Sequence, residues 1–152
     1  MPPVLNAVAG GWQLSGIYSF VSGAPLTLVV SGATLGNGVN ARPNLVGDPT
    51  VARKSAALWF NPAAFAAPAA RQFGTSAPGA VVGPASHVLS AGLFKNFKIR
   101  EQKYLQFRWE MFNALNEVNL GAPVTTIGLA TTGSISSAGD PRQMQMALKL
   151  VF

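Results

Sequence analysis

Large apolar side chains alternate with polar ones along the last segment of the chain, RQMQMALKLVF. Every second position holds a large apolar residue: Met144, Met146, Leu148, Leu150 and Phe152. A period of two places successive side chains on opposite faces of a strand. A helical spacing fits only part of this segment, because it leaves Met146, Leu150 and Phe152 on other faces. The pattern predicts a two-faced strand over 142–152.

Similar alternation predicts four further strands, near 11–22, 24–31, 88–99 and 104–115. The last of these is the clearest, and its apolar positions are Leu105, Phe107, Trp109 and Met111, with Gln106, Arg108 and Glu110 between them. The turn REQK joins it to the strand before it. Gly23 and Pro25 form a turn signal between the first two strands, so these two are predicted to pair as an antiparallel hairpin.

Lys95 interrupts the apolar positions of the predicted strand 88–99. A lysine that faces lipid at mid-depth costs about 2–4 kcal/mol. We therefore expect either a β-bulge near Lys95 and Asn96, which turns the lysine away, or a position close to the lipid headgroups.

The periodicity disappears in two segments, 32–87 and 116–141, which are rich in Gly, Pro, Asn and Ala. Both are predicted to be loops, with one helical turn in SAALWF that the Asn61-Pro62 step ends. Loops of such length are uncommon in compact soluble domains, but the outer loops of membrane β-barrels are long.

Composition favours the same fold class. Only 11% of the residues are charged, against about 25% in ordinary soluble domains. No run of about 18 apolar residues is present, so strands, not helices, are the expected membrane-crossing elements. The segment MPPVLNAVAG has neither the basic start nor the apolar centre of a signal peptide. The sequence thus predicts an all-β antiparallel meander of about five strands.

The net charge of +6 does not indicate nucleic-acid binding. The basic residues gather around one short connection, and no RNA-binding signature accompanies them. These residues are Lys95, Lys98, Arg100, Lys103 and Arg108. We expect no nucleic-acid partner and interpret these charges as solvated turn residues.

Catalytic and metal chemistry lack the residues they need. His87 is the one histidine, and there is no cysteine, so a zinc site is short of ligands. Ser86, His87 and Asp48 do not make a catalytic triad, because adjacent positions seldom orient for proton transfer. The glycine-rich segments lack a phosphate-binding pattern. We therefore predict no enzymatic activity and no catalytic, cofactor-binding or metal-binding residues.

Seven stretches, in order, resemble the C-terminal end of TonB-dependent outer-membrane receptors, most closely the Oar-like group with a carboxypeptidase-regulatory-like domain. They cover nearly everything after Ala9: GGWQLSGIYSFVSGAPLT, ARPNLVGDP, WFNPAAFAAP, FGTSAPGAVVGP, LFKNFKI, LQFRWEMFNALN and SAGDPRQMQMALKLVF. The resemblance implies part of the wall of a large barrel in the bacterial outer membrane. It also implies that the strand ending at Phe152 is the signal read by the barrel-assembly machinery.

The resemblance assigns a role to each face. It implies that Trp12, Leu14, Leu105, Phe107, Trp109 and Met111 face lipid, and that Gln106, Arg108 and Glu110 line the lumen. Arg108 and Glu110 are expected to pair there. Four aromatic residues are expected in the periplasmic girdle: Tyr18, Phe20, Tyr104 and Phe152. The loops around Arg42 to Pro49 and Trp59 to Phe65 are expected to lie outside, over the mouth.

Receptors of this group also have a signal peptide, a plug domain, a TonB-binding segment and about 22 strands. We interpret the chain as a truncated copy or fragment whose partners are outer-membrane lipid, the assembly machinery and the remainder of a parent barrel with its plug. TonB would act only through the missing N-terminal part, in uptake of an unidentified substrate. Two alternatives stay open: a passive structural or adhesive outer-membrane barrel, and a soluble all-β binding module.

Overall fold

The computed structural model describes residues 8–32, 35, 38–100 and 103–152. The described chain divides into two compact units. We call residues 8–20, 87–118 and 140–152 the sheet unit, and residues 21–86 and 119–139 the connection unit. Two residues of the predicted turn REQK, Glu101 and Gln102, lie outside the described residues.

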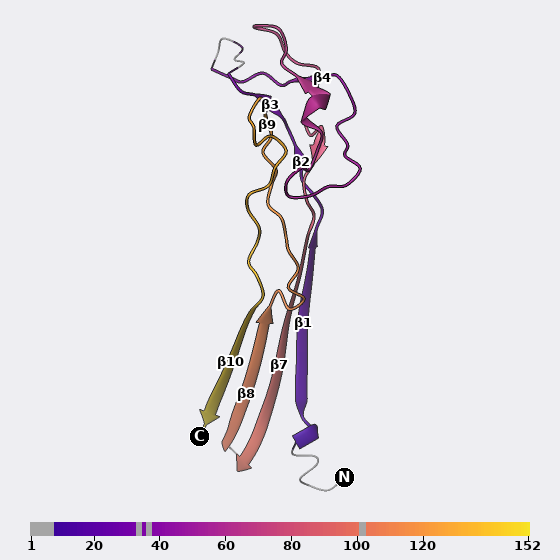
Figure 1. The fold of residues 1–152 in the computed structure, drawn as a ribbon. Coiled ribbons are helices and arrows are strands. Elements are labelled where there is room, and N and C mark those ends of the chain that lie inside the picture. Colours follow the sequence, from indigo (N-terminus) through magenta and orange to yellow (C-terminus); the bar gives the residue numbers. More distant parts are fainter. Residues whose placement is uncertain (1–7, 33–34, 36–37, 101–102) are drawn as a thin grey trace. The chain divides into compact units, whose positions relative to one another are not determined.

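The sheet unit is built on four strands: β1 (Trp12–Val21), β7 (Ser86–Arg100), β8 (Lys103–Phe112) and β10 (Gln143–Val151). They form one sheet in the order β1-β7-β8-β10, and neighbouring strands run in opposite directions (Figure 1). This confirms the predicted all-β antiparallel meander, with four strands in the sheet where about five were expected. The strands predicted near 11–22, 88–99, 104–115 and 142–152 correspond to these four.

The predicted strand 24–31 is wrong, and so is its hairpin with the first strand. β1 pairs with β7, whereas 24–31 contains two short strands, β2 (Pro25–Leu26) and β3 (Val29–Val30). The alternation that suggested a strand has another cause. Leu28 and Val30 are buried in the core of the connection unit, at 0% and 5% exposure.

The connection unit has a hydrophobic core, although most of its sequence has no periodicity. Its strand pairs are β2 with β6 (Val81–Val82), β3 with β9 (Thr126–Ile127) and β4 (Asn44–Leu45) with β5 (Phe65–Ala66). The core cluster consists of Leu28, Val30, Phe60, Ala64, Phe65, Val81 and Ile127. Backbone hydrogen bonds from Trp59 N to Gly133 O and from Ile135 N to Ala56 O join the two predicted loops. They therefore pack together as one structure.

The predicted helical turn in SAALWF is wrong, because the turn begins at the Asn61-Pro62 step instead of ending there. The 3-10 helix η1 spans Pro62–Ala64, and Asn61 caps it by accepting a hydrogen bond from Ala63 N at 3.1 Å. Proline suits the first helical position, where its missing N–H needs no partner. No helix within the described residues is long and apolar enough to span a membrane.

Of the two alternatives expected for Lys95, the bulge near Lys95 and Asn96 is wrong, and the position close to the headgroups stays a prediction. Both residues keep regular register, opposite Phe107 and Gln106, and the register shift in β7 lies between Lys98 and Arg100. Lys95 therefore lies on the same face of the sheet as Leu93 and Phe97.

Candidate functional site

Strand length is the first functional feature of the sheet unit. A β-strand that crosses a membrane needs about 9–11 tilted residues. β1 and β8 each have 10 residues and β10 has 9, while β7, with 15, is longer. Three of the four strands therefore have the length of a membrane crossing.

One face of the sheet is apolar across the cross-strand rows. Leu93, Trp109 and Met146 share one row, and Phe97, Leu105 and Leu150 share another. We call this the apolar face; its large apolar members also include Trp12, Leu14, Phe107, Met111, Met144 and Leu148. Met146 is 72% exposed and Leu148 68%. Water does not normally border so large an apolar surface on a monomeric protein.

The predicted lipid-facing residues all lie on this face. Trp12 packs edge-on against Phe107, with ring centroids 6.0 Å apart. Four of the predicted assembly-signal residues lie within β10, and each is opposite a predicted lipid-facing residue of β8. The pairs run from Met144 opposite Met111 to Leu150 opposite Leu105. Phe152 follows β10 and is 88% exposed.

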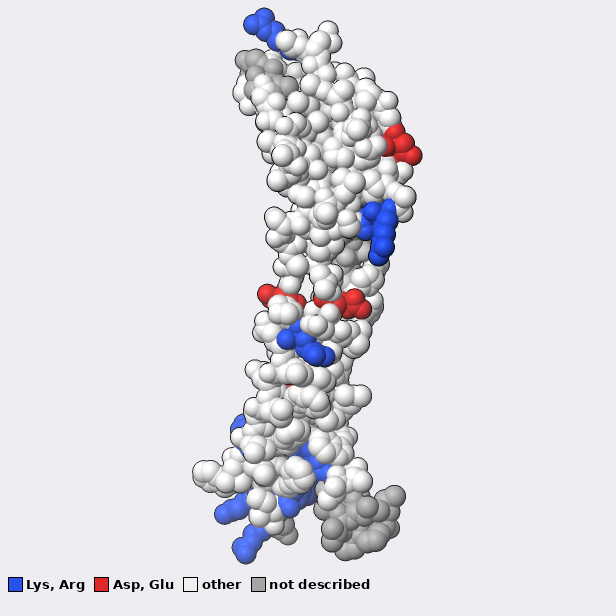
Figure 2. All heavy atoms as spheres, viewed as in Figure 1, with Lys and Arg blue, Asp and Glu red and all other residues white. Residues whose placement is uncertain are grey.

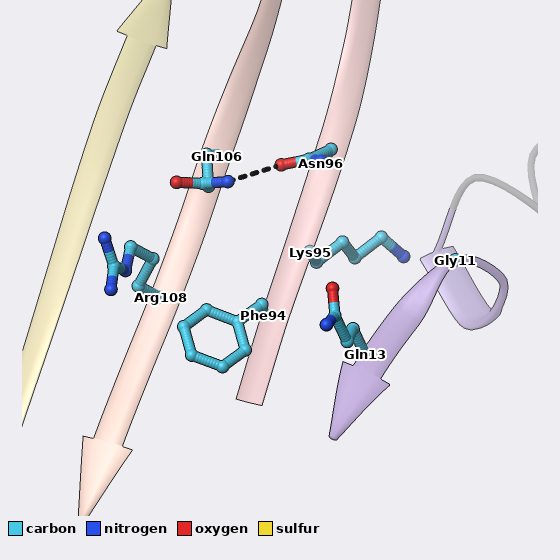
Figure 3. Close-up of a pocket in the computed structure, with 7 residues that line it drawn as sticks. All are labelled: Gly11, Gln13, Phe94, Lys95, Asn96, Gln106 and Arg108. Atoms are coloured by element: carbon cyan, nitrogen blue, oxygen red, sulfur yellow. Dashed lines mark hydrogen bonds between the residues drawn. The ribbon is translucent and has the colours of Figure 1, made fainter. Parts of the chain in front are cut away.

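The opposite face carries polar side chains that bond across the strands, and we call it the polar face. Gln106 Nε2 donates to Asn96 Oδ1 at 3.1 Å (Figure 3). Arg108 Nη2 donates to Glu110 Oε1 at 2.7 Å, which confirms the predicted pair. Gln145 Nε2 donates to the second oxygen of Glu110, also at 2.7 Å. The three predicted lumen residues therefore lie together on one face.

A cavity of about 270 Å³ opens beside these residues. It is lined by Gly11, Gln13, Phe94, Lys95, Asn96, Gln106 and Arg108, which come from β1, β7 and β8 and the residue before β1 (Figure 3). The guanidinium of Arg108 lies 5.3 Å from the centre of the Phe94 ring, a cation–π contact. Such a polar lining suits a water-filled lumen.

Lys95 belongs to the apolar face but is only 3% exposed. Its ammonium donates to the backbone oxygen of Val8 and lies 4.8 Å from the Trp12 ring centre and 5.0 Å from that of Phe97. These contacts replace water around the charge. The alternation of the sequence showed that a lysine lies on this face. It could not show that its partners are Val8, which precedes β1, and Trp12, the first residue of β1.

His87 forms an aromatic group that the sequence did not reveal. A hydrogen bond of 2.9 Å joins Tyr18 Oη and His87 Nδ1, and the Phe20 ring lies 4.9 Å from the His87 ring. The group lies at the end of β1 and the start of β7. Aromatic residues with polar tips are enriched where a membrane meets water.

The prediction of one girdle from Tyr18, Phe20, Tyr104 and Phe152 is wrong. Tyr104 lies opposite Val151, at the end of the sheet where β8 begins and β10 finishes. Tyr18 and Phe20 lie near His87, at the other end. Tyr104 is also opposite Lys98 and shares the polar face with Gln106. The antiparallel strand order separates residues that their aromatic character had grouped.

The two ends of the sheet differ in their connections. β1 finishes and β7 begins at the same end where β8 finishes and β10 begins, so both long connections leave from that end (Figure 1). The connection between β7 and β8 is short and lies at the opposite end. Outer-membrane barrels have long extracellular loops and short periplasmic turns.

Within the described ranges, no three His, Asp or Glu residues lie close enough to hold a metal ion.

Comparison with known proteins agrees with the two-faced sheet. No curated protein and no solved structure matches the chain. A protein family described as an outer membrane beta barrel domain matches residues 2–145, which is most of the chain. Strand length, strand order and the contrast between the faces are those of such a barrel. The chain therefore belongs to the outer membrane beta barrel domain family, whose place is the bacterial outer membrane.

Proposed function

We propose that the chain supplies the C-terminal strands of a TonB-dependent outer-membrane transporter of the Oar-like group. It would contribute barrel wall, extracellular loops and the terminal assembly signal for energy-coupled uptake of an unidentified substrate. The observation that carries this proposal is the four-stranded sheet, with one apolar and one polar face and both long connections at one end.

We propose that the two faces of the sheet border different environments. The apolar face would lie against outer-membrane lipid, because several of its large apolar side chains, among them Leu14, Met146 and Leu148, are exposed and the face carries few polar groups. The polar face would line the lumen, where Arg108, Glu110 and Gln145 satisfy one another. A charged pair without such partners would be costly away from water.

The edges of the sheet support a larger assembly. β1 and β10 are the outer strands of the open sheet. Their unpaired backbone groups need partners, and a closed barrel supplies them. We propose that these partners are further strands of a parent protein, which would also hold the plug domain and the segment that binds TonB.

The strand β10 is proposed to be the assembly signal, through Met144, Met146, Leu148, Leu150 and Phe152. Its four large apolar side chains project from an edge strand, and each is more than half exposed. An edge strand of this kind can add to the sheet of the barrel-assembly machinery by backbone hydrogen bonding. We propose no catalytic role for the chain and no cofactor or metal.

The connection unit is proposed to lie on the extracellular side. It contains the loops around Arg42 to Pro49 and Trp59 to Phe65, and its buried cluster gives it a defined structure. A packed structure of this kind is suited to covering the mouth of a barrel. Contact with substrate is a second role that its exposed side chains would allow.

Photo-crosslinking in cells tests the transporter proposal. A photo-reactive residue is placed in the TonB-binding segment of the full-length parent, and a crosslink to TonB that depends on the proton-motive force is expected. A folded outer-membrane barrel with no plug domain and no TonB crosslink would instead identify a passive structural or adhesive barrel. A parent found only as a water-soluble monomer would indicate the soluble all-β binding module.

A further inference from the structure

Two basic residues lie directly opposite each other at one end of the sheet. Arg100, the last residue of β7, pairs in register with Lys103, the first residue of β8. Both are exposed, and neither forms a salt bridge with another described residue. Like charges directly opposite on neighbouring strands repel and destabilise the pairing. An anion from outside would remove this repulsion.

The pair lies on the apolar side of the sheet. Lys103 alternates in β8 with Tyr104 and so shares the face of Leu105. The nearest apolar row is Phe97, Leu105 and Leu150. The two cations thus lie directly beyond the end of the apolar face. Basic side chains at such a border reach the level of the lipid headgroups.

The position in the sheet also identifies the leaflet. The pair flanks the short connection between β7 and β8, and short connections of outer-membrane barrels lie on the periplasmic side. Lys and Arg side chains gather toward this end of the sheet unit (Figure 2). The periplasmic leaflet is therefore the lipid surface that Arg100 and Lys103 meet.

We propose that Arg100 and Lys103 bind the phosphate of an anionic phospholipid headgroup in the periplasmic leaflet. Arginine offers a planar set of donors that matches two phosphate oxygens, and lysine adds a mobile point charge. This proposal rests on the outer-membrane location of the chain and does not depend on TonB-coupled transport, so it can fail while the transporter proposal stands.

The polar face provides a matched control. Lys98 lies opposite Tyr104, and Lys149 lies opposite Gln106, so both belong to the polar face near the same end of the sheet. Removing these two charges changes the net charge as much as removing Arg100 and Lys103. If the lipid site lies on the apolar side, removing Arg100 and Lys103 should weaken lipid binding more than removing Lys98 and Lys149. A general electrostatic attraction would be weakened equally by both changes.

Vesicle flotation tests the proposal. The 152-residue chain is diluted from urea into vesicles of phosphatidylcholine alone or with added phosphatidylglycerol, and a density gradient separates floating, vesicle-bound protein from sedimenting aggregate. We expect stronger binding to the vesicles that contain phosphatidylglycerol. R100Q/K103Q should weaken this preference roughly tenfold or more, while K98Q/K149Q should keep more than half of it.

Two further measurements separate a lipid site from a folding defect and from a site for free phosphate. R100K/K103R keeps both charges, so it should keep the preference; its loss would show that the substitutions act through folding and would overturn the proposal. Inorganic phosphate at matched ionic strength should not abolish the preference, and abolition would assign the pair to free phosphate instead. Equal loss in R100Q/K103Q and K98Q/K149Q, or no preference in the unchanged protein, would also refute the lipid site.

Discussion

Glu110 links two neighbouring strands through its two carboxylate oxygens. One accepts a hydrogen bond from Arg108 on the same strand, and the other accepts from Gln145 on β10, each at 2.7 Å. Gln145 lies directly opposite Glu110 in the register. The side chain of Glu110 is still 26% exposed, so water screens the ion pair and keeps its contribution modest.

Glu110→Ala should lower the free energy of unfolding, because it removes both hydrogen bonds to the carboxylate. The loss can be measured by urea titration of the folded barrel in lipid vesicles. Gln143→Ala is the matched control, since the Gln143 side chain makes no hydrogen bond among the described residues. Equal effects of the two substitutions would contradict the role given to Glu110.

The two faces predict opposite outcomes for neighbouring residues. Arginine at Phe107 should destabilise the barrel by about 2–4 kcal/mol if that position is near the membrane midplane. Arginine at Gln106, on the polar face, should be tolerated. The unfolding free energies of the two variants, measured in the same vesicles, test which face borders lipid. Equal tolerance of the two arginines would refute the assignment of faces.

Sequence alternation predicts which face a residue occupies but not what it touches. Arg108 and Glu110 are two positions apart on one strand, so their pairing follows from the strand period alone. The partners of Lys95 do not: its ammonium reaches Val8 O, 87 positions away in sequence. Long-range contacts of this kind depend on which strands become neighbours, and that information is absent from local periodicity.

At the scale of elements, alternation identifies strands but not their pairing. β8 and β10 were predictable because each has a continuous two-residue period. The segment from Leu26 to Val30 has the same period, yet its buried side chains serve the core of the connection unit. A turn signal next to β1 therefore suggested a hairpin that does not form, since the pairing partner of β1 is β7.

Changes at Phe152, after the terminal strand β10, should cause a defect in barrel assembly. Deleting Phe152, or replacing it with Asp, should prevent insertion of the full-length barrel, because the exposed aromatic end of the proposed assembly signal is lost. The amount of folded barrel in outer-membrane fractions can be measured by its heat-modifiable migration in gels. Phe152→Tyr keeps an aromatic end and should assemble. Normal amounts of folded Phe152→Asp protein would refute the signal.

In the connection unit, Gly74 is a position where a larger side chain should disturb the packing. A Cβ at this position would lie 2.0 Å from the backbone oxygen of Arg42 and 2.4 Å from that of Pro43. Backbone atoms cannot easily move away, and the Ser76 N to Pro43 O hydrogen bond holds the two segments together. Gly74→Ala should thus separate them.

We expect Gly74→Ala to increase protease cleavage of the connection unit at least several-fold, consistent with a loss of roughly 1–3 kcal/mol from overpacking. Gly47→Ala is the control, because a Cβ there would lie 3.5 Å from Ala64 Cα, an ordinary contact distance. Limited proteolysis of intact cells compares the two variants. Equal resistance would show that residues 42–43 and 74–76 can separate without loss of structure.

At the scale of the whole chain, the two long connections form one packed unit. β3 from the first connection pairs with β9 from the second, and both contribute to the same buried cluster. Neither segment alone contains enough apolar residues in a regular pattern to predict this packing. Within the connection unit, contacts between the two connections therefore hold the loops of successive strand pairs together.

The last prediction concerns the chain on its own. Its sheet is open, with β1 and β10 as outer strands whose backbone groups lack a neighbour, and its apolar face is exposed. The unpaired edges are tolerated neither in water nor in lipid without partners, and the apolar face is not tolerated in water. Four strands are also too few to close, since the smallest barrels have about eight. The isolated chain should therefore aggregate or require detergent, and it should produce no conductance in planar bilayers. A monomeric, water-soluble product with a cooperative thermal transition would show that the apolar face is covered within the chain, and would favour a soluble binding module over a barrel wall.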